Sequence, residues 1–198
     1  MKTHVRRSLL ITVFAVFFLL FLLLLFYFTQ VANEKTAFQG STFQNQIVSK
    51  VSLGLPVRLI IPAINVNTKI QYVGVTPKGE MEIPSNAVDV GWFKLGSRPG
   101  EKGSAVIAGH FDGKNGEAGV FTDLYKLKKG DKLYVEDSKG TSIIFVVRES
   151  RTYDPGYADD VFSRNDGTYL NLVTCDGVWD GAKKSYSKRL VVFADITD

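Results

Sequence analysis

The chain has 198 residues, of which 45% are hydrophobic, and its 24 basic and 20 acidic residues give a formal net charge of +4. Three of the basic residues, Lys2, Arg6 and Arg7, precede a long apolar run and no acidic residue does, so the remainder carries 21 basic against 20 acidic residues. The positive balance is a local feature of the N-terminus and does not indicate nucleic-acid binding. The length allows one domain with a substantial core rather than two.

Residues 9–28 form the apolar run, in which Thr12 is the only polar side chain. A helix of 20 residues is roughly 30 Å long, which matches the hydrocarbon core of a bilayer. The run is longer than the apolar region of a signal peptide, and residues 29–33 (TQVAN) are a poor cleavage site. We therefore predict a retained transmembrane helix. By the positive-inside rule its basic flank, residues 1–8, stays cytoplasmic and everything after it lies outside the cytoplasm.

Two kinds of sequence follow this segment. Residues 29–52 are rich in Gln, Asn, Ser and Thr without a sustained period, which predicts a polar stalk. From residue 53 to 198 short β-branched runs alternate with Gly, Pro, Asn and Asp, which is typical of an all-β domain. The expected strands are residues 55–61, 64–73, 81–83, 104–109, 131–136, 141–149, 168–175 and 188–195.

Helical segments in this domain are few and short. Single turns are predicted near residues 120–127 and 158–163, and Lys139-Gly140 is expected to turn a hairpin between two of the strands. So many strands with so few helices predict a closed barrel or a sandwich rather than an α/β fold.

Cys175 is the only cysteine, so this domain cannot form an internal disulfide. An unpaired thiol outside the cytoplasm is either a small buried apolar group or a reactive one. Cys175 comes at the end of a predicted strand, directly before Asp176-Gly177. A strand end at the rim of a barrel is a place where a reactive group can meet a substrate, which favours the reactive interpretation.

His110 is the only histidine apart from His4 in the cytoplasmic flank, and it follows the strand at 104–109. One cysteine and one histidine cannot build a Cys/His-rich structural zinc site, but they can form a thiol nucleophile with its acid/base partner. At neutral pH only about 3% of an ordinary cysteine is thiolate, and an amine that leaves an amide needs a proton. His110 can supply that proton. No metal and no cofactor is expected.

Arg189 is the candidate for stabilising the oxyanion. Cys175 ends one predicted strand and Arg189 begins the next, and antiparallel pairing would place both at the same rim. A guanidinium can stabilise an oxyanion without titrating.

These residues resemble the motifs of the sortase family of cysteine transpeptidases. The resemblance covers about residues 53–197 and rests on Ala108-Gly109-His110, on Leu172-Val173-Thr174-Cys175 and on Arg189. The family signature TLxTC aligns with residues 171–175, where Asn171 replaces the first threonine. The runs at 110–112 and 61–64 are most similar to the class E or F branches.

The resemblance implies an eight-stranded β-barrel, anchored in the membrane, that cleaves an LPxTG-like sorting signal through a thioacyl intermediate. An amine of a peptidoglycan precursor or a pilin lysine then receives the acyl group, so surface proteins with sorting signals and that amine are the implied partners. Cys175 would be the nucleophile, His110 the general acid/base and Arg189 the oxyanion or positioning group. Thr174, Ala108 and the loop 153–167, with Tyr153 and Pro155, would face the peptide.

Two other functions remain open at this point. An L,D-transpeptidase-like enzyme also acts on peptidoglycan with a cysteine, but it would carry a histidine two residues before it, where this chain has Val173. A non-catalytic binding module on a stalk could use Trp92 and Trp179 as contact residues. Alkylation of Cys175 would leave a binding module intact and would abolish a transpeptidase.

Overall fold

The computed structural model describes residues 20, 22–28, 53–156 and 159–197. Residues 20 and 22–28 are helical, and within the described ranges no helix is both long enough and apolar enough to cross a bilayer. Most of the predicted transmembrane helix at 9–28, the flank 1–8 and the polar stalk 29–52 lie outside the described residues.

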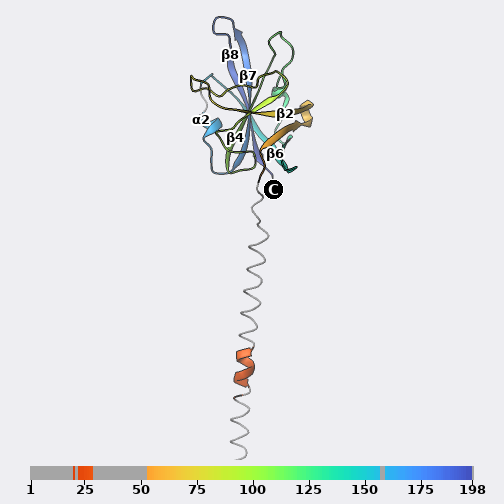
Figure 1. The fold of residues 1–198 in the computed structure, drawn as a ribbon, viewed down its shortest axis with the longest axis vertical. Coiled ribbons are helices and arrows are strands. Elements are labelled where there is room, and N and C mark those ends of the chain that lie inside the picture. Colours follow the sequence, from red (N-terminus) through yellow and green to blue (C-terminus); the bar gives the residue numbers. More distant parts are fainter. Residues whose placement is uncertain (1–19, 21, 29–52, 157–158, 198) are drawn as a thin grey trace, which may run out of the picture. The chain divides into compact units, whose positions relative to one another are not determined.

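From Leu53 onward the chain forms a closed barrel of eight strands, with three short helical segments (Figure 1). This confirms the all-β prediction of a closed eight-stranded barrel. The helical segments are η1 (Pro62–Ile64), η2 (Leu124–Lys126) and α2 (Asp159–Phe162). The strands are β1 (Pro56–Ile61), β2 (Val66–Val73), β3 (Val90–Phe93), β4 (Gly103–Gly109), β5 (Lys132–Asp137), β6 (Ser142–Tyr153), β7 (Thr168–Asp180) and β8 (Ser185–Ile196).

The order of strands around the barrel is β1-β2-β3-β4-β7-β8-β6-β5. Most neighbours are antiparallel, but β2 runs parallel to β3 and β4 runs parallel to β7. Parallel strands bring their C-terminal ends to the same rim. The ends of β4 and β7 therefore meet although they are far apart in the sequence.

One predicted strand was wrong. Met81 makes only an isolated bridge to Val75, and the eighth strand is β3 instead. This strand is short and contains Gly91, which weakens its strand pattern in the sequence. A Cβ at Gly91 would lie 2.8 Å from a methyl group of Val73, so the glycine allows β3 to pack closely on β2.

The turn predictions are confirmed. Lys139-Gly140 connects the antiparallel strands β5 and β6, where Gly140 has a φ of +81°. The predicted helical turns correspond to η2 and α2. Strands β7 and β8 are longer than predicted and form a hairpin that projects from one end of the barrel (Figure 1).

Alternation along β7 separates two apolar clusters. Leu170 and Leu172 point into the barrel and belong to its large inner core. Val173 lies on the outer face and packs against a smaller cluster formed by Val106, Val161, Val191 and Phe193. Segment α2 covers this outer face through Val161, which is 3% exposed. Residues 171, 173 and 175 thus share the outer face of β7.

Candidate active site

The parallel pairing of β4 with β7 places the two candidate catalytic residues at one rim. Ala108 pairs with Val173, so His110 and Cys175 each follow two residues beyond paired positions. The hydroxyl of Thr174 donates a hydrogen bond to the carbonyl oxygen of Gly109 at 2.9 Å. This buried contact ties the residue before His110 to the residue before Cys175.

Arg189 lies directly opposite Cys175 in the antiparallel pairing of β7 with β8. The expectation that these two residues share a rim is confirmed. The guanidinium donates to the carbonyl oxygens of Tyr186 and Lys188 and to the hydroxyl of Ser185, at 3.0, 2.8 and 3.0 Å. These bonds fix the orientation of the cation within its own hairpin.

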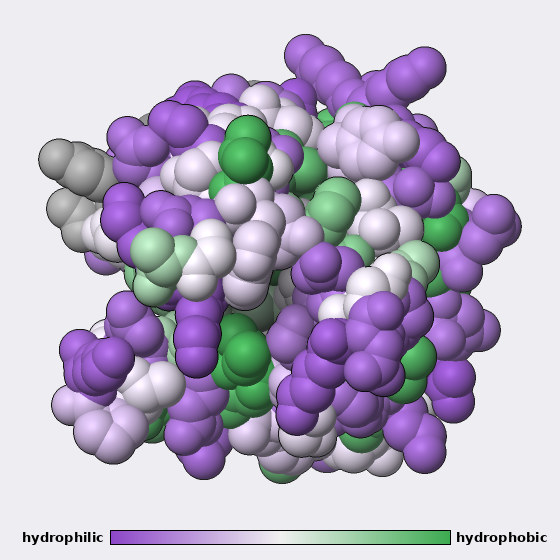
Figure 2. Space-filling model, turned by 90° about the horizontal axis from the view of Figure 1, so that it is seen from above, coloured by the Kyte–Doolittle hydropathy of each residue, from purple (hydrophilic) through white to green (hydrophobic). Residues whose placement is uncertain are grey.

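A cavity of about 120 Å³ joins the three candidate residues. Figure 2 views the molecule from the end where the β7–β8 hairpin lies, and it shows a hollow in which hydrophobic side chains are exposed among hydrophilic ones. The cavity is lined by Ile83, Pro84, Ala108, Gly109, His110, Val173, Thr174, Cys175 and Arg189. Its walls are mostly apolar, so charges that develop inside it are weakly screened.

The thiol of Cys175 is half-buried, and burial raises its pKa. The positive charge of Arg189 acts in the opposite direction and lowers the pKa, whereas the carboxylate of Asp112 raises it. Burial is the largest of these effects. The resting thiol is therefore mainly protonated at neutral pH, and it needs a base when it attacks.

His110 is held by a residue that the sequence did not single out. Its Nε2 lies 3.0 Å from the carbonyl oxygen of Pro84, in the segment between β2 and β3. A carbonyl oxygen only accepts hydrogen bonds, so Nε2 carries the proton and Nδ1 is left for proton transfer. The segment itself is held by Glu82, whose Oε2 accepts a hydrogen bond of 2.7 Å from the amide of Gly74.

Asp112 connects the His110 loop to the β7–β8 hairpin. It accepts a hydrogen bond of 2.5 Å from the hydroxyl of Tyr186, and this bond raises the pKa of Tyr186 to about 12. Asp112 and His110 also line a second cavity of about 590 Å³. The acidic residues Asp112 and Glu117 face this cavity together with Lys114.

The predicted substrate-binding residues are dispersed. Ala108 and Thr174 line the Cys175 cavity, although the hydroxyl of Thr174 is used by Gly109. Tyr153 lies opposite Arg189 on β8 and packs against the outer cluster. Pro155 is exposed in the loop beyond β6. Their contact with a substrate stays a prediction.

The arrangement has the groups that acyl transfer requires. It combines a thiol, an imidazole with a defined free nitrogen and a fixed guanidinium around one small cavity, and His110 also lines the larger cavity. In the part of the chain that the structure describes, no three His, Cys, Asp or Glu side chains are grouped to hold a metal ion.

Comparisons with known proteins agree with this geometry. A family model described as the Sortase domain matches residues 59–197. Sortase C-1 from Actinomyces oris is 25% identical, with a TM-score of 0.58 over 72% of this chain and 75% of that chain. Sortase C from Clostridium perfringens SM101 is 26% identical, with a TM-score of 0.54 over 75% and 73%. Streptococcus agalactiae sortase C1, in complex with MTSET, is 26% identical, with a TM-score of 0.57 over 72% and 67%. No curated protein matches significantly.

Proposed function

This chain belongs to the sortase family of cysteine transpeptidases, and on that basis we propose that it cleaves an LPxTG-like sorting signal between Thr and Gly and transfers the acyl fragment to an amine. The amine belongs to the cell wall or to a pilin. The observation that supports this proposal most is the shared cavity of the chain's only thiol, of His110 and of Arg189.

In the first half of the reaction the sulfur of Cys175 attacks the carbonyl carbon of the signal's threonine. The thiol proton passes to Nδ1 of His110, which then carries protons on both ring nitrogens. When the C–N bond breaks, His110 returns this proton to the departing glycine amine, and a thioester remains on Cys175. The hydrogen bond from Nε2 to the carbonyl of Pro84 supports this assignment, because it leaves Nδ1 as the ring nitrogen without a proton.

In the second half an amine attacks the thioester and gives a proton to Nδ1 of His110. The new C–N bond forms, the C–S bond breaks and the thiol takes the proton back. The cavity of about 590 Å³ beside His110 is the route we assign to the departing and incoming amines, because His110 lines both this cavity and the Cys175 cavity. Asp112 and Glu117 would attract a protonated amine to it.

Arg189 would stabilise the negative oxygen that forms in both halves. Its hydrogen bonds to Tyr186, Lys188 and Ser185 hold the guanidinium in place before the reaction, so little reorganisation is required.

Replacement of Cys175 tests the proposed activity. In Cys175→Ala the fold should persist, while cleavage of fluorogenic LPxTG-like peptides should fall to background, since no other side chain can form the thioester. Peptide turnover and mass-spectrometric detection of the acyl-enzyme measure this. Retention of more than a few per cent of wild-type turnover would contradict the assignment of the nucleophile.

We also propose that residues 9–28 anchor the enzyme in the membrane with the barrel outside the cytoplasm. The support is the apolar run of 20 residues behind a basic flank. Cell fractionation should find the full chain in the membrane pellet after washing with carbonate, and a chain lacking residues 2–28 in the soluble fraction. Recovery of the full chain as a soluble protein would refute the anchor.

A further inference from the structure

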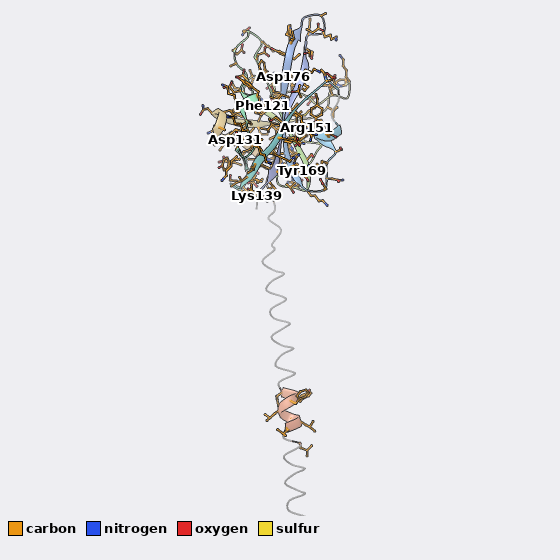
Figure 3. The ribbon with its side chains drawn as sticks, turned by 180° about the vertical axis from the view of Figure 1, so that it is seen from behind. Phe121, Asp131, Lys139, Arg151, Tyr169 and Asp176 are labelled. Atoms are coloured by element: carbon orange, nitrogen blue, oxygen red, sulfur yellow. The ribbon has the colours of Figure 1, made fainter. Side chains whose placement is uncertain are left out.

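The outer half of the β7–β8 hairpin does not simply continue the barrel. Gly177 and Val178 of β7 together oppose the single residue Ser187 of β8. This is a β-bulge, and Gly177 supplies the positive φ, +82°, that such a bulge often requires. A bulge bends the strand, so the residues beyond it leave the direction that the barrel sets. Figure 3 shows Asp176 toward this end of the barrel and Tyr169 toward the opposite end.

The guanidinium of Arg189 depends on this outer half of the hairpin for its hydrogen bonds. Arg189 itself lies on the barrel side of the bulge, opposite Cys175. Two of the acceptors described above, the hydroxyl of Ser185 and the carbonyl oxygen of Tyr186, lie beyond the bulge. A movement of the outer half would therefore move the guanidinium relative to the thiol.

Tyr186 holds the outer half of the hairpin against the His110 loop. Its hydroxyl donates the hydrogen bond of 2.5 Å to Asp112, which follows two residues after His110. A hydrogen bond to a carboxylate is stronger than one between neutral groups. The ring of Tyr186 also meets the ring of Phe111 edge to face, with centroids 5.6 Å apart, and that of Trp179 at 5.3 Å. One side chain thus joins the hairpin to the loop.

The His110 loop gives this contact a fixed base. The amide of Phe121, whose side chain is fully buried, donates a hydrogen bond of 2.9 Å to the carbonyl oxygen of His110. Asp112 forms an isolated antiparallel bridge with Ala118 across the loop. Because the loop is anchored in the core, a hydrogen bond to Asp112 can restrain the hairpin.

We propose that Tyr186 is a positioning residue for the transfer reaction. Its hydroxyl, bonded to Asp112, keeps the guanidinium of Arg189 and the imidazole of His110 in one arrangement around Cys175. These groups come from different segments of the chain, and a displacement of about 1 Å at a reacting centre can cost on the order of a hundredfold in rate. The inference rests on the proposed function, because it assigns Tyr186 a role in that reaction.

Tyr186→Phe removes the hydroxyl and keeps the ring that packs on Phe111 and Trp179. In the full-length enzyme, kcat for cleavage of a fluorogenic LPxTG-like peptide should fall about tenfold or more. KM should stay within about twofold, because Tyr186 is not among the residues that line the Cys175 cavity. Tyr125→Phe is the matched control, since it removes a hydroxyl from an exposed tyrosine of η2. Its kcat and KM should match those of the wild type.

Two substitutions at Asp112 separate the hydrogen bond from the charge. Asp112→Asn and Asp112→Ala both remove the carboxylate, but only the asparagine keeps an oxygen that can accept the hydrogen bond from Tyr186. The kcat of Asp112→Asn should therefore exceed that of Asp112→Ala by about fivefold or more. When Tyr186→Phe is added to each, the two values should agree within about twofold, because no hydroxyl is left to bond.

Alkylation of Cys175 by iodoacetamide gives a readout that needs no peptide. The charges of Arg189 and Asp112 both act on this thiol. If the hydroxyl of Tyr186 holds Arg189 beside Cys175, Tyr186→Phe should slow alkylation at pH 7, as the loss of the Arg189 charge would. Asp112→Ala should also react more slowly than Asp112→Asn, although both lack the carboxylate.

Equal rates for Asp112→Asn and Asp112→Ala, in cleavage and in alkylation, would overturn the proposal. A loss in Tyr186→Phe that appears in KM alone would also overturn it, because Tyr186 would then bind substrate. If wild-type enzyme cleaves no sorting peptide, the proposed function fails, and the alkylation rates still decide whether Tyr186 holds Arg189. If Tyr186→Phe does not fold, the comparison of the two Asp112 variants, which keep Tyr186, decides.

Discussion

The thiol of Cys175 lies in a field set by two opposite charges. Burial raises its pKa, the guanidinium of Arg189 lowers it and the carboxylate of Asp112 raises it. Arg189 therefore has one effect on the resting thiol, whose pKa it lowers, and in the proposed reaction it would also bind the oxyanion. Alkylation of the thiol depends only on the first effect, whereas the proposed peptide cleavage would depend on both.

Removing one charge at a time should move the thiol pKa in opposite directions. In Arg189→Gln the pKa should rise and iodoacetamide should react several-fold more slowly at pH 7, because the stabilising charge is lost. In Asp112→Asn the pKa should fall and alkylation should become faster. The pH dependence of the alkylation rate measures both variants. In Asp112→Asn the pKa of Tyr186 should also fall from about 12, because Asp112 no longer holds a charge beside the hydroxyl.

Arg58→Gln is the control for this pair, because Arg58 pairs with Glu136 on β1 and β5, away from the cavity. Its alkylation profile should match that of the wild type. If Arg189→Gln and Asp112→Asn shifted the profile in the same direction, disturbed packing rather than charge would be responsible.

At the scale of elements, the parallel pair β4–β7 is what assembles the site. A parallel pair cannot be joined by a tight turn, so the chain between these strands winds through β5, β6 and α2 before it returns. The end of β4 also packs tightly against the core. Gly109 makes this packing possible, since a Cβ there would lie 2.5 Å from an atom of the buried ring of Phe121.

Gly109→Ala should therefore weaken both the core and the site. The added methyl group must displace Phe121 or the end of β4, at a cost of about 1–3 kcal/mol in the free energy of unfolding. Because His110 is the next residue, kcat/KM should fall as well. Urea unfolding and peptide cleavage measure the two effects. Gly181→Ala is the control, because a Cβ there would meet nothing within 4 Å. Unchanged unfolding of Gly109→Ala would show that the core can accommodate the methyl group.

At the scale of the whole molecule, the sequence predicted those features of the fold that depend on short, continuous runs of residues. Regular β-branched runs predicted seven strands, and strand ends placed His110, Cys175 and Arg189 at a rim. The prediction that Cys175 and Arg189 lie side by side was based on the antiparallel pairing of two consecutive strands. The structure pairs these two residues directly. Strand β3 was not predicted, because one of its four residues is Gly91, which weakens the strand pattern. The structure shows that this glycine allows close packing on Val73.

Contacts made by backbone atoms could not be predicted in this way. The carbonyl of Pro84 orients His110 across 26 positions of sequence, and a carbonyl oxygen leaves no signature in the identity of its residue. Asn171 was visible as a departure from the family signature, but its burial beneath α2 and its unpaired Oδ1 depend on how distant segments pack. Such features follow from the closed barrel as a whole.

The cavity of about 590 Å³ beside His110 has a consequence for the timing of the proposed reaction. In that proposal this one cavity would serve both the fragment that departs and the amine that arrives. Because both molecules would use the same cavity, the departing fragment would have to leave before the acceptor amine could bind. The enzyme would then never bind the departing fragment and the acceptor at the same time. When the acceptor binds, the acyl group on Cys175 would be the only part of the first substrate still present.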